Sequence, residues 1–397
     1  MNKHIRIVGQ GYVGLPLAIA AAKSGYKVVG VDIDQVVVNS LNLGVSHIAD
    51  VLSADISYAI QAGNYHATNI FEKFGSTAIN VICVPTPLTN DGQPDLSILI
   101  KCLRDLSATL RGGDLIIIES TVAPGTVREI LIPEVYANSE VKLGDLYFAY
   151  SPERIDPTNS TWNITNTPKL LSGLDEISLR IAHDFYSNFI EKIITCSSIE
   201  IAETDKLLEN SFRLVNISLV NEIAKFSNKI GLEVNEVIEA ASTKPYGYMP
   251  FFPSLGAGGH CIPVDPIYMS RRAREVGAQI KLIEIAEEIN LEMIAYFVAR
   301  AKKIIGTLIS KKILVIGISY KSNVSDVRQT PAVPLINELK KCGAEVFWHD
   351  DLVGEWNNEK SQPISEDFDL AILVTPHDYL ELTKLGSTPI LNTRSSK

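Results

Sequence analysis

The stretch IRIVGQGYVG, residues 5–14, decides the fold of the N-terminal part of the chain. Its first four residues form a largely apolar run typical of a buried strand, and Gly9, Gly11 and Gly14 follow with the G-x-G-x-x-G spacing. Gly9 permits a tight turn, Gly11 lets the backbone approach a pyrophosphate, and Gly14 lets a following helix pack closely against the strand. The stretch therefore predicts a strand, a turn and a helix that together bind a dinucleotide.

Asp32 supports this interpretation, because it ends the next predicted strand, eighteen positions after Gly14. A carboxylate at this position accepts hydrogen bonds from the adenosine ribose hydroxyls and repels a 2′-phosphate, which favours NAD over NADP. We expect Tyr12 and Val13, inside the glycine turn, to contact the cofactor as well. FAD, which binds the same fingerprint, and a turn that binds no ligand are the alternatives.

Strand and helix patterns alternate through the first half of the chain. Runs rich in Val and Ile at residues 28–31, 80–84, 115–119 and near 147–150 suit strands that are buried on both faces. Residues 17–24 and 96–110 have the pattern of helices between these strands. Repeated strand–helix units of this kind predict a doubly wound parallel sheet.

The pattern changes in the middle of the chain. Residues 199–230 carry apolar side chains at three- and four-residue steps, which predicts one long helix. A segment rich in glycine and proline, residues 244–266, separates it from a second long helix that we expect at residues 281–309. Two long helices between α/β units indicate a connector, and we expect them to form the interface of a homodimer.

From residue 312 onward the α/β pattern returns, with predicted strands at 313–316, 345–348, 369–374 and 389–391 and a predicted helix at 331–342. The predicted fold class is therefore α/β, with two Rossmann-like doubly wound parallel-sheet domains joined by long central helices. We place the three parts at residues 1–198, 199–309 and 310–397. The first is the expected NAD-binding domain.

Composition argues against several classes of function. The net charge is −10 and no basic block stands out, so nucleic acid is not an expected partner. No leader-like segment precedes the first strand, and the apolar runs have strand length, so we expect neither a signal peptide nor a membrane partner. The five widely spaced cysteines predict no disulfide framework and no metal site, and they indicate the reducing cytoplasm.

Two further loops follow predicted strands, at the edge where doubly wound sheets bind ligands. In residues 84–87, VPTP, Pro85 stiffens the backbone and Thr86 presents a hydroxyl to a cofactor. In residues 119–126, ESTVAPGT, Thr121 is predicted to do the same. Alternatively, these threonines have structural roles only, and Thr126 caps the next helix.

Residues 255–266, LGAGGHCIPVDP, carry the most informative chemistry. Glycines allow the backbone to approach a ligand, and prolines hold the exit of the loop rigid. Cys261 lies between them and is therefore predicted to be a nucleophile rather than an inert buried thiol. Its thiolate could attack an aldehyde carbon to give a thiohemiacetal, which loses a hydride to become a thioester that water cleaves.

Lys206 and Asn210 lie four residues apart on the first long helix and therefore share one face. An ammonium and an amide side by side could stabilise an oxyanion, whereas the alternative is an unremarkable surface pair. Two carboxylates, Asp265 and Glu153, could each handle a proton or a water molecule. The residues alone do not decide between them.

Taken together, these motifs resemble those of the UDP-glucose/GDP-mannose dehydrogenase superfamily over nearly the whole chain. The resemblance rests on GQGYVG with Asp32, CVPTP, ESTVAPGT, YSPERIDP, the Lys206 and Asn210 pair, GAGGHCIPVDP and YKSNVSDVRQTPA. It implies that Cys261 is the nucleophile of two successive NAD-dependent oxidations of a nucleotide sugar. It also implies that the C-terminal domain binds the UDP part of that substrate.

The resemblance assigns roles to the surrounding residues. Lys206 and Asn210 would steady the oxyanion, and Asp265 would assist proton transfer. Glu153 and Thr121 would position the hydrolytic water and also contact the cofactor.

Further contacts follow from the same resemblance. Arg328 would complete the cofactor site, and Arg394 resembles a further cofactor-side arginine. The implied substrate contacts are Glu153, Arg154, Lys206, Asn210, Phe251, Phe252, Pro253, Ser254, Gly258 and Lys321.

Two stretches, residues 151–157 and 240–266, look closest to UDP-N-acetylglucosamine 6-dehydrogenases, which implies that sugar nucleotide as the substrate of a surface-polysaccharide pathway. Val264 stands where UDP-glucose dehydrogenases usually have lysine, which argues against glucose. Residues 254–257 (SLGA), Thr158 and Asn392 depart from the usual pattern. UDP-glucose, UDP-ManNAc and UDP-GalNAc therefore remain alternatives.

Two functions of other kinds fit parts of the sequence. A two-electron hydroxyacid dehydrogenase has a similar N-terminal fold, but it needs no cysteine and yields one NADH per substrate. A non-catalytic sensor of nucleotide sugars would keep the fold, and the presence of Cys261, Lys206, Asn210 and Asp265 argues against it.

Overall fold

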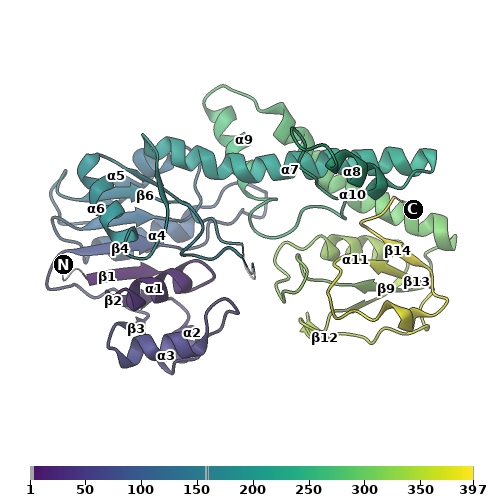
Figure 1. The fold of residues 1–397 in the computed structure, drawn as a ribbon, viewed down its shortest axis with the longest axis horizontal. Coiled ribbons are helices and arrows are strands. Elements are labelled where there is room, and N and C mark those ends of the chain that lie inside the picture. The colour runs from purple at the N-terminus through teal and green to yellow at the C-terminus, as the bar shows by residue number, and fades with distance from the viewer. Residues whose placement is uncertain (1–3, 157–158, 160, 397) are drawn as a thin grey trace. The chain divides into compact units, whose positions relative to one another are not determined.

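The computed structural model describes residues 4–156, 159 and 161–396. Pro157 and Thr158, which belong to or follow the SPERIDP motif, lie outside the described residues. The chain divides into two compact units, Met1–Leu208 and Glu209–Lys397 (Figure 1). Among the described helices, none combines the length and the apolar character needed to cross a membrane.

Within its described residues, the first unit holds an eight-stranded sheet in the order β3-β2-β1-β4-β5-β6-β7-β8. All neighbouring strands run parallel except β6 and β7, which run antiparallel. The strands are β1 His4–Val8, β2 Lys27–Val31, β3 Tyr65–Thr68, β4 Ala78–Ile82, β5 Leu115–Ile118, β6 Tyr147–Tyr150, β7 Lys169–Gly173 and β8 Ile193–Thr195. The predicted strands are confirmed to within two residues, whereas β3, β7 and β8 were not predicted.

Helices cover both faces of this sheet (Figure 1). They are α1 Gly14–Lys23, α2 Gln35–Asn42, α3 Ser53–Gln61, α4 Ser97–Ser107, the π-helical turn η1 Val127–Leu131, α5 Ile132–Ala137 and α6 Glu176–Tyr186. On one face, Leu15 of α1 and Phe185 of α6 pack with Ile7 of β1. On the other, Leu99 of α4 packs with Ile116 of β5. Cover on both faces explains why the central strands are nearly continuous apolar runs.

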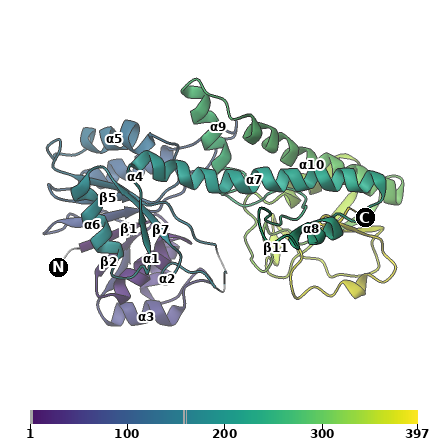
Figure 2. The same ribbon diagram turned by 45° about the horizontal axis from the view of Figure 1, so that its top comes forward.

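The first long helix, α7, begins at Ile199 and ends at Ile230, as predicted, and Figure 2 shows it as one continuous helix. A short helix that the sequence did not predict, α8 Val234–Ser242, follows it. Helix α9, Asp265–Glu275, starts inside the predicted loop, because Pro266 fits the first turn of a helix, where no backbone N–H is needed. Helix α10, Lys281–Ile305, ends four residues before the predicted position because Gly306 terminates it with a φ of 79°.

The second unit holds a parallel four-stranded sheet in the order β10-β9-β13-β14 within its described residues. Its elements are β9 Lys312–Ile316, α11 Ala332–Lys341, β10 Glu345–His349, the small hairpin β11 Glu355–Trp356 and β12 Glu359–Lys360, β13 Leu370–Leu373, the 3-10 turn η2 Leu382–Leu385 and β14 Ile390–Asn392. Phe297 of α10 and Leu335 of α11 pack on one face of the sheet, and Leu385 of η2 packs on the other. The predicted α/β class is confirmed, with a parallel sheet in the second unit and a sheet in the first that is parallel except at β6 and β7.

Candidate functional site

The glycine turn after β1 is built by close backbone contacts. Gly9 has a φ of +87°, and a Cβ there would lie 2.6 Å from the carbonyl oxygen of Cys83. A Cβ on Gly14 would lie 1.8 Å from the carbonyl oxygen of Gly9, so only glycine lets α1 start this close to the turn. A Cβ on Gly11, in contrast, would have no atom of the described residues within 4 Å apart from its two chain neighbours. The turn thus leaves open space at Gly11, and this cradle fits the pyrophosphate of NAD.

The carboxylate of Asp32 fixes the same turn. One oxygen accepts the backbone N–H of Gln10 at 2.7 Å, and the other accepts that of Asp34 at 2.9 Å. The side chain is only half-buried, so it can still reach a ribose hydroxyl. Tyr12 and Val13 lie in the turn itself, with Val13 directly before α1.

The loops that follow β4 and β5 are joined by hydrogen bonds. The hydroxyl of Thr86 donates to the carbonyl of Thr121 at 2.8 Å, and the hydroxyl of Ser120 donates to the carbonyl of Val84 at 2.7 Å. Because the Thr86 hydroxyl already donates its proton to the carbonyl of Thr121, it would act toward a cofactor as a hydrogen-bond acceptor. Pro85 is exposed between them.

A residue that the sequence did not reveal, Glu203 of α7, holds the far end of the second loop. Its carboxylate accepts the backbone N–H of Gly125 at 2.6 Å and that of Val127 at 2.9 Å, and the residue has no exposed surface. The expectation that Thr126 caps the next helix is wrong: Thr126 has a helical φ of −57° and makes no side-chain cap. The buried carboxylate satisfies the amides at this helix start instead.

Glu153 and Lys206 meet in the first unit. The ammonium of Lys206 lies 2.5 Å from one carboxylate oxygen of Glu153, and their side chains are 6% and 15% exposed. The other carboxylate oxygen accepts the backbone N–H of Ile155 at 2.9 Å. The structure therefore brings together two of the predicted catalytic residues in a largely dry ion pair.

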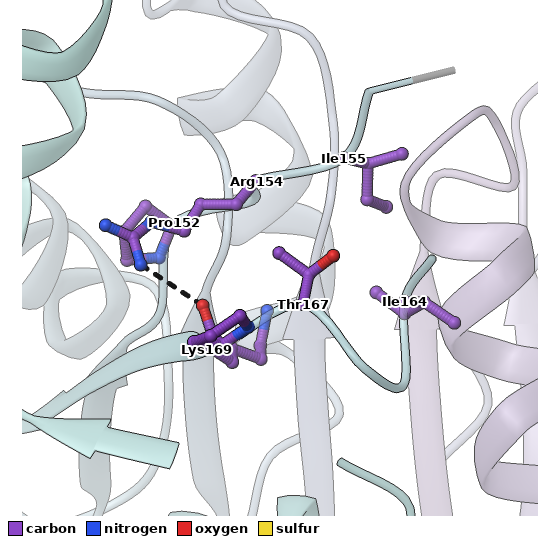
Figure 3. A pocket seen from close by; sticks show the side chains of 7 residues that line it. Pro152, Arg154, Ile155, Ile164, Thr167 and Lys169 are labelled. Carbon is purple, nitrogen blue, oxygen red and sulfur yellow. Dashed lines mark hydrogen bonds between the residues drawn. The ribbon is translucent and has the colours of Figure 1, made fainter. Parts of the chain in front are cut away.

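Arg154 stabilises the loop that contains residues 151–154 (SPER) through two contacts. Its guanidinium donates to the carbonyl of Pro168 at 3.1 Å and pairs with Asp205 of α7 at 3.2 Å. Figure 3 shows Arg154 at the rim of a small pocket, with Ile155, Ile164 and Lys169 around it. In this structure its partners are protein groups, and a contact with substrate remains a proposal.

Apart from the predicted nucleophile Cys261, three cysteines are poor candidates for that role. Burial raises the pKa of the Cys83 thiol well above its usual value and that of Cys102 to about 12. Burial also raises the pKa of Cys196. With raised pKa values these thiols stay protonated near neutral pH, and they are poor nucleophiles because the thiolate is the reactive form.

In the second unit, Cys261 lies in the turn that leads into α9. Its carbonyl oxygen accepts the backbone N–H groups of Val264 and Asp265, at 3.1 and 2.9 Å. Asp265 is 3% exposed, and its carboxylate accepts a hydrogen bond from the side-chain amide of Asn210 at 2.6 Å. The partly exposed cysteine is therefore tied to α7 through the carboxylate that follows it by four residues.

Two asparagines that were not predicted support the segment of residues 251–264 that contains Cys261, here called the cysteine loop. The side-chain oxygen of Asn290 on α10 accepts the N–H of Ala257 at 2.6 Å, and that of Asn221 on α7 accepts the N–H of Ser254 at 2.9 Å. Asn221 follows Asn210 by eleven residues, or three helical turns, so its place on the same face was visible in the sequence.

The predicted substrate residues from Phe251 to Gly258 lie along this segment, whereas Lys321 lies on the loop after β9. The ring of Phe251 packs edge-on against Phe212 of α7 at 5.7 Å between centroids, Pro253 is buried and Phe252 is exposed. A Cβ on Gly258 would lie 2.7 Å from Pro331, and one on Gly259 would lie 2.9 Å from the ring of Tyr320. The cysteine loop therefore rests on the loop that carries Lys321.

The predicted arginines of the second unit have identifiable partners. The guanidinium of Arg328 donates to both carboxylate oxygens of Asp326, at 3.0 and 2.6 Å. Burial lowers the pKa of Arg394, whose backbone carbonyl accepts a hydrogen bond from the side-chain amide of Asn235 at 2.9 Å.

Asp350, directly after β10, anchors the loop that begins at Gly317. One carboxylate oxygen accepts the N–H groups of Ile318 and Ser319 and lies 3.1 Å from the ring nitrogen of His377. The other ring nitrogen of His377 accepts the N–H of Asn323 at 2.9 Å. Burial alone would raise the pKa of Asp350, but the hydrogen bonds from His377 and Ser319 outweigh it and lower the pKa to about 2.

We expect Asp350→Asn to lower the free energy of unfolding by about 2 kcal/mol near pH 7, because that energy corresponds to a carboxyl whose pKa is about 2 in the folded chain and about 3.9 when unfolded. This stabilisation is present above the pKa of an unfolded aspartate, about 3.9, and disappears as the pH falls toward 2. Denaturant unfolding, followed by the fluorescence of the neighbouring buried Trp348, measures it.

The matched control is Asp351→Asn, since that side chain is 65% exposed and should change stability little. If Asp350→Asn were equally destabilising at pH 7 and pH 2.5, the ionised network would not be the cause.

Comparison with known proteins gives matches along the chain. Residues 3–190 match the NAD binding domain of the UDP-glucose/GDP-mannose dehydrogenase family, residues 200–292 match its central domain and residues 314–391 match its UDP binding domain. The UDP-N-acetyl-D-mannosamine dehydrogenase of Pyrococcus horikoshii is 34% identical over 382 residues, which cover 94% of this chain and 89% of that protein.

A second relative carries a different substrate in its name. The UDP-N-acetyl-D-glucosamine 6-dehydrogenase of Pseudomonas aeruginosa is also 34% identical, over 351 residues that cover 86% of this chain and 81% of that protein. Among solved structures, that of a UDP-D-ManNAc dehydrogenase from Pyrococcus horikoshii superposes with a TM-score of 0.89 at 31% identity, covering 98% of this chain and 95% of the other. Sequence identity therefore does not separate the two sugars.

Proposed function

This chain belongs to the UDP-glucose/GDP-mannose dehydrogenase family, and we propose that it oxidises the C6 hydroxymethyl group of a UDP-N-acetylhexosamine to a carboxylate. It is an NAD-dependent UDP-sugar dehydrogenase by family, and the proposal concerns the sugar and the residues that act. The observation that carries it is the hydrogen bond between Asn210 and Asp265, which ties the segment of Cys261 to the helix that also bears Lys206.

The chemistry follows from the groups present. NAD, when bound, accepts one hydride in each of the two oxidations. The Cys261 thiolate adds to the C6 aldehyde and forms a C–S bond, which gives a thiohemiacetal whose oxidation leaves a thioester. Water then breaks that C–S bond, releasing the carboxylate and regenerating the thiol.

The surrounding side chains support these steps. Lys206 and Asn210 donate to the oxyanion at C6, and Asp265 takes up or returns a proton. Glu153, already paired with Lys206, and Thr121 orient the attacking water. The buried ammonium of Lys206 stabilises a developing negative charge more strongly than an ammonium in water does, because the effective dielectric constant inside the protein is lower.

The binding assignments complete the proposal. The cofactor would contact Gly9, Gly11, Tyr12, Val13, Gly14, Asp32, Pro85, Thr86, Thr121, Glu153 and Arg328. The UDP-sugar would contact Glu153, Arg154, Lys206, Asn210, Phe251, Phe252, Pro253, Ser254, Gly258 and Lys321. The division into residues 1–198, 199–309 and 310–397 belongs to the same proposal.

We propose UDP-N-acetylglucosamine as the sugar nucleotide, on the motifs at residues 151–157 and 240–266, with UDP-N-acetylmannosamine as the alternative. Relatives named for each sugar are equally similar to this chain. Initial rates of NADH formation with UDP-GlcNAc, UDP-ManNAc, UDP-GalNAc and UDP-glucose would decide between them. A preference for UDP-glucose would overturn the N-acetylhexosamine assignment.

The reaction as proposed predicts two NADH per sugar nucleotide consumed. Absorbance of NADH, measured against loss of the UDP-sugar by chromatography, gives this ratio directly. A ratio of one would indicate a simple two-electron dehydrogenase. Tight binding of UDP-sugars without any NADH would indicate a non-catalytic sensor.

We also propose a cytoplasmic homodimer that forms through α7. A stripe of apolar side chains along this helix is exposed in the single chain: Phe212, Leu219, Ile223, Phe226 and Ile230. Exposed apolar side chains at three-, four- and seven-residue steps share one face of a helix and are typical of a helix that packs against a partner. Sedimentation equilibrium at twice the chain mass of 43.5 kDa would support the dimer, and a monomer would exclude it.

A further inference from the structure

We propose that Glu203 is a positioning residue, which holds the Thr121 loop at a fixed distance from Lys206. The inference rests on the function proposed above, because that function gives Thr121 and Lys206 their roles. Glu203 itself would touch neither substrate nor cofactor.

The first support is the geometry of the carboxylate. Each of its oxygens accepts one backbone N–H, that of Gly125 at 2.6 Å and that of Val127 at 2.9 Å, and no part of Glu203 is exposed. A buried carboxylate without partners is strongly unfavourable, so the loss of either hydrogen bond would leave a buried oxygen unsatisfied. The positive end of the peptide dipoles at the start of η1 adds to the attraction.

The contact of Glu203 with Gly125 and Val127 joins two parts of the proposed site. Glu203 precedes Lys206 by three residues on α7, so the two side chains share a face of one rigid helix. The amides that it binds follow Thr121 by only a few residues, and the carbonyl of Thr121 is held by Thr86. Glu203 therefore links α7 directly to the loop after β5, and through the Thr86 hydrogen bond to the loop after β4.

The isosteric change Glu203→Gln tests this link. Glutamine keeps one acceptor oxygen, but its NH2 group would face a backbone N–H, so one of the two bonds must break. We expect kcat to fall about tenfold to a hundredfold and the KM for NAD to rise, because a misplacement of about 1 Å is enough for such losses. The KM for the UDP-sugar should stay within twofold, and the melting temperature should show that the variant is folded at the assay temperature.

Glu200→Gln is the matched control. Glu200 lies one turn earlier on the same helix and pairs with Arg128 of the same η1 segment at 2.6 Å, but both side chains are substantially exposed. Exposed ion pairs contribute little, so kcat and both KM values should stay within twofold of the unmodified enzyme.

Two further measurements keep the test decisive. If Glu203→Gln does not fold, Glu203→Asp retains the charge but withdraws it by about one C–C bond, or 1.5 Å, and should show the same split between kcat and sugar KM. Hydrogen exchange of the peptide that contains Gly125 and Val127 should be faster in either variant than in the unmodified chain.

The outcomes separate this inference from the proposed function. If the unmodified chain oxidises no UDP-sugar, the proposed function fails, and the inference is then judged by hydrogen exchange and NAD affinity. A folded Glu203→Gln variant with unchanged kcat, NAD affinity and amide exchange would overturn the positioning role. A lower melting temperature with unchanged kinetics would show a merely structural role.

Discussion

Replacing Cys261 with serine is expected to lower the rate of complete oxidation at least about a thousandfold while NAD affinity stays unchanged. Serine preserves the size of the side chain, so the loop held by Asn290 and Asn221 should keep its shape. Its hydroxyl, however, ionises far above neutral pH and is a weak nucleophile without an adjacent base. The measurement is NADH formed per sugar nucleotide together with NAD binding by calorimetry.

Cys342→Ser is the control for this change, because Cys342 is another partly buried cysteine of the second unit, at the end of α11. Its kcat should stay within twofold of the unmodified enzyme. Two NADH per sugar at an undiminished rate in Cys261→Ser would refute covalent catalysis by this residue. Slow formation of one NADH, with aldehyde accumulating, would instead confirm that only the later steps need the thiol.

Replacing Gly14 with alanine is expected to abolish measurable NAD binding and to lower the free energy of unfolding of the first unit by about 2–4 kcal/mol. The added methyl would lie 1.8 Å from the carbonyl oxygen of Gly9, which is backbone and cannot rotate away. Either α1 or the turn must move, and both form the proposed pyrophosphate cradle. Thermal unfolding and NAD calorimetry measure the two effects.

Gly11→Ala separates packing from ligand contact. A Cβ at Gly11 would lie more than 4 Å from every described residue other than its chain neighbours, so this variant should melt close to the unmodified chain. Its NAD affinity should nevertheless fall, because the methyl would occupy the space proposed for the pyrophosphate. Unchanged stability and affinity in Gly14→Ala would show that the turn is not the cofactor cradle.

The sequence predicted those elements whose burial is reflected in their own residues. The central strands are buried on both faces and appear as continuous apolar runs. In α7 the apolar residues recur at helical spacing over 32 residues. The sequence therefore predicted the bounds of these elements accurately. The strands β3 and β8 lie at the sheet edges and are only three or four residues long, so they show no such run. Helix α8 is short and follows the glycine that ends α7.

The sequence could propose candidate site residues where the residues concerned are neighbours in sequence. The glycine turn, the cysteine loop and the Lys206 and Asn210 pair are of this kind. Glu203 and Asp350 were missed because their partners are backbone amides far along the chain: Glu203 binds amides 76 and 78 residues away. Local spacing does not show such contacts, and the alternative in which Thr126 caps the next helix is wrong for the same reason.

Two carboxylates at equivalent positions of the two sheets, Asp32 and Asp350, differ in their exposure to solvent. Asp32 and Asp350 each end the second strand of their unit, and each accepts an N–H from the turn after the first strand. Asp32 remains half-buried, whereas Asp350 is sealed from solvent, with Ser319 and His377 against it. With Asp32 in the ribose-binding role proposed above, each polypeptide should carry a single equivalent of dinucleotide, although it contains the strand–turn–acid arrangement twice.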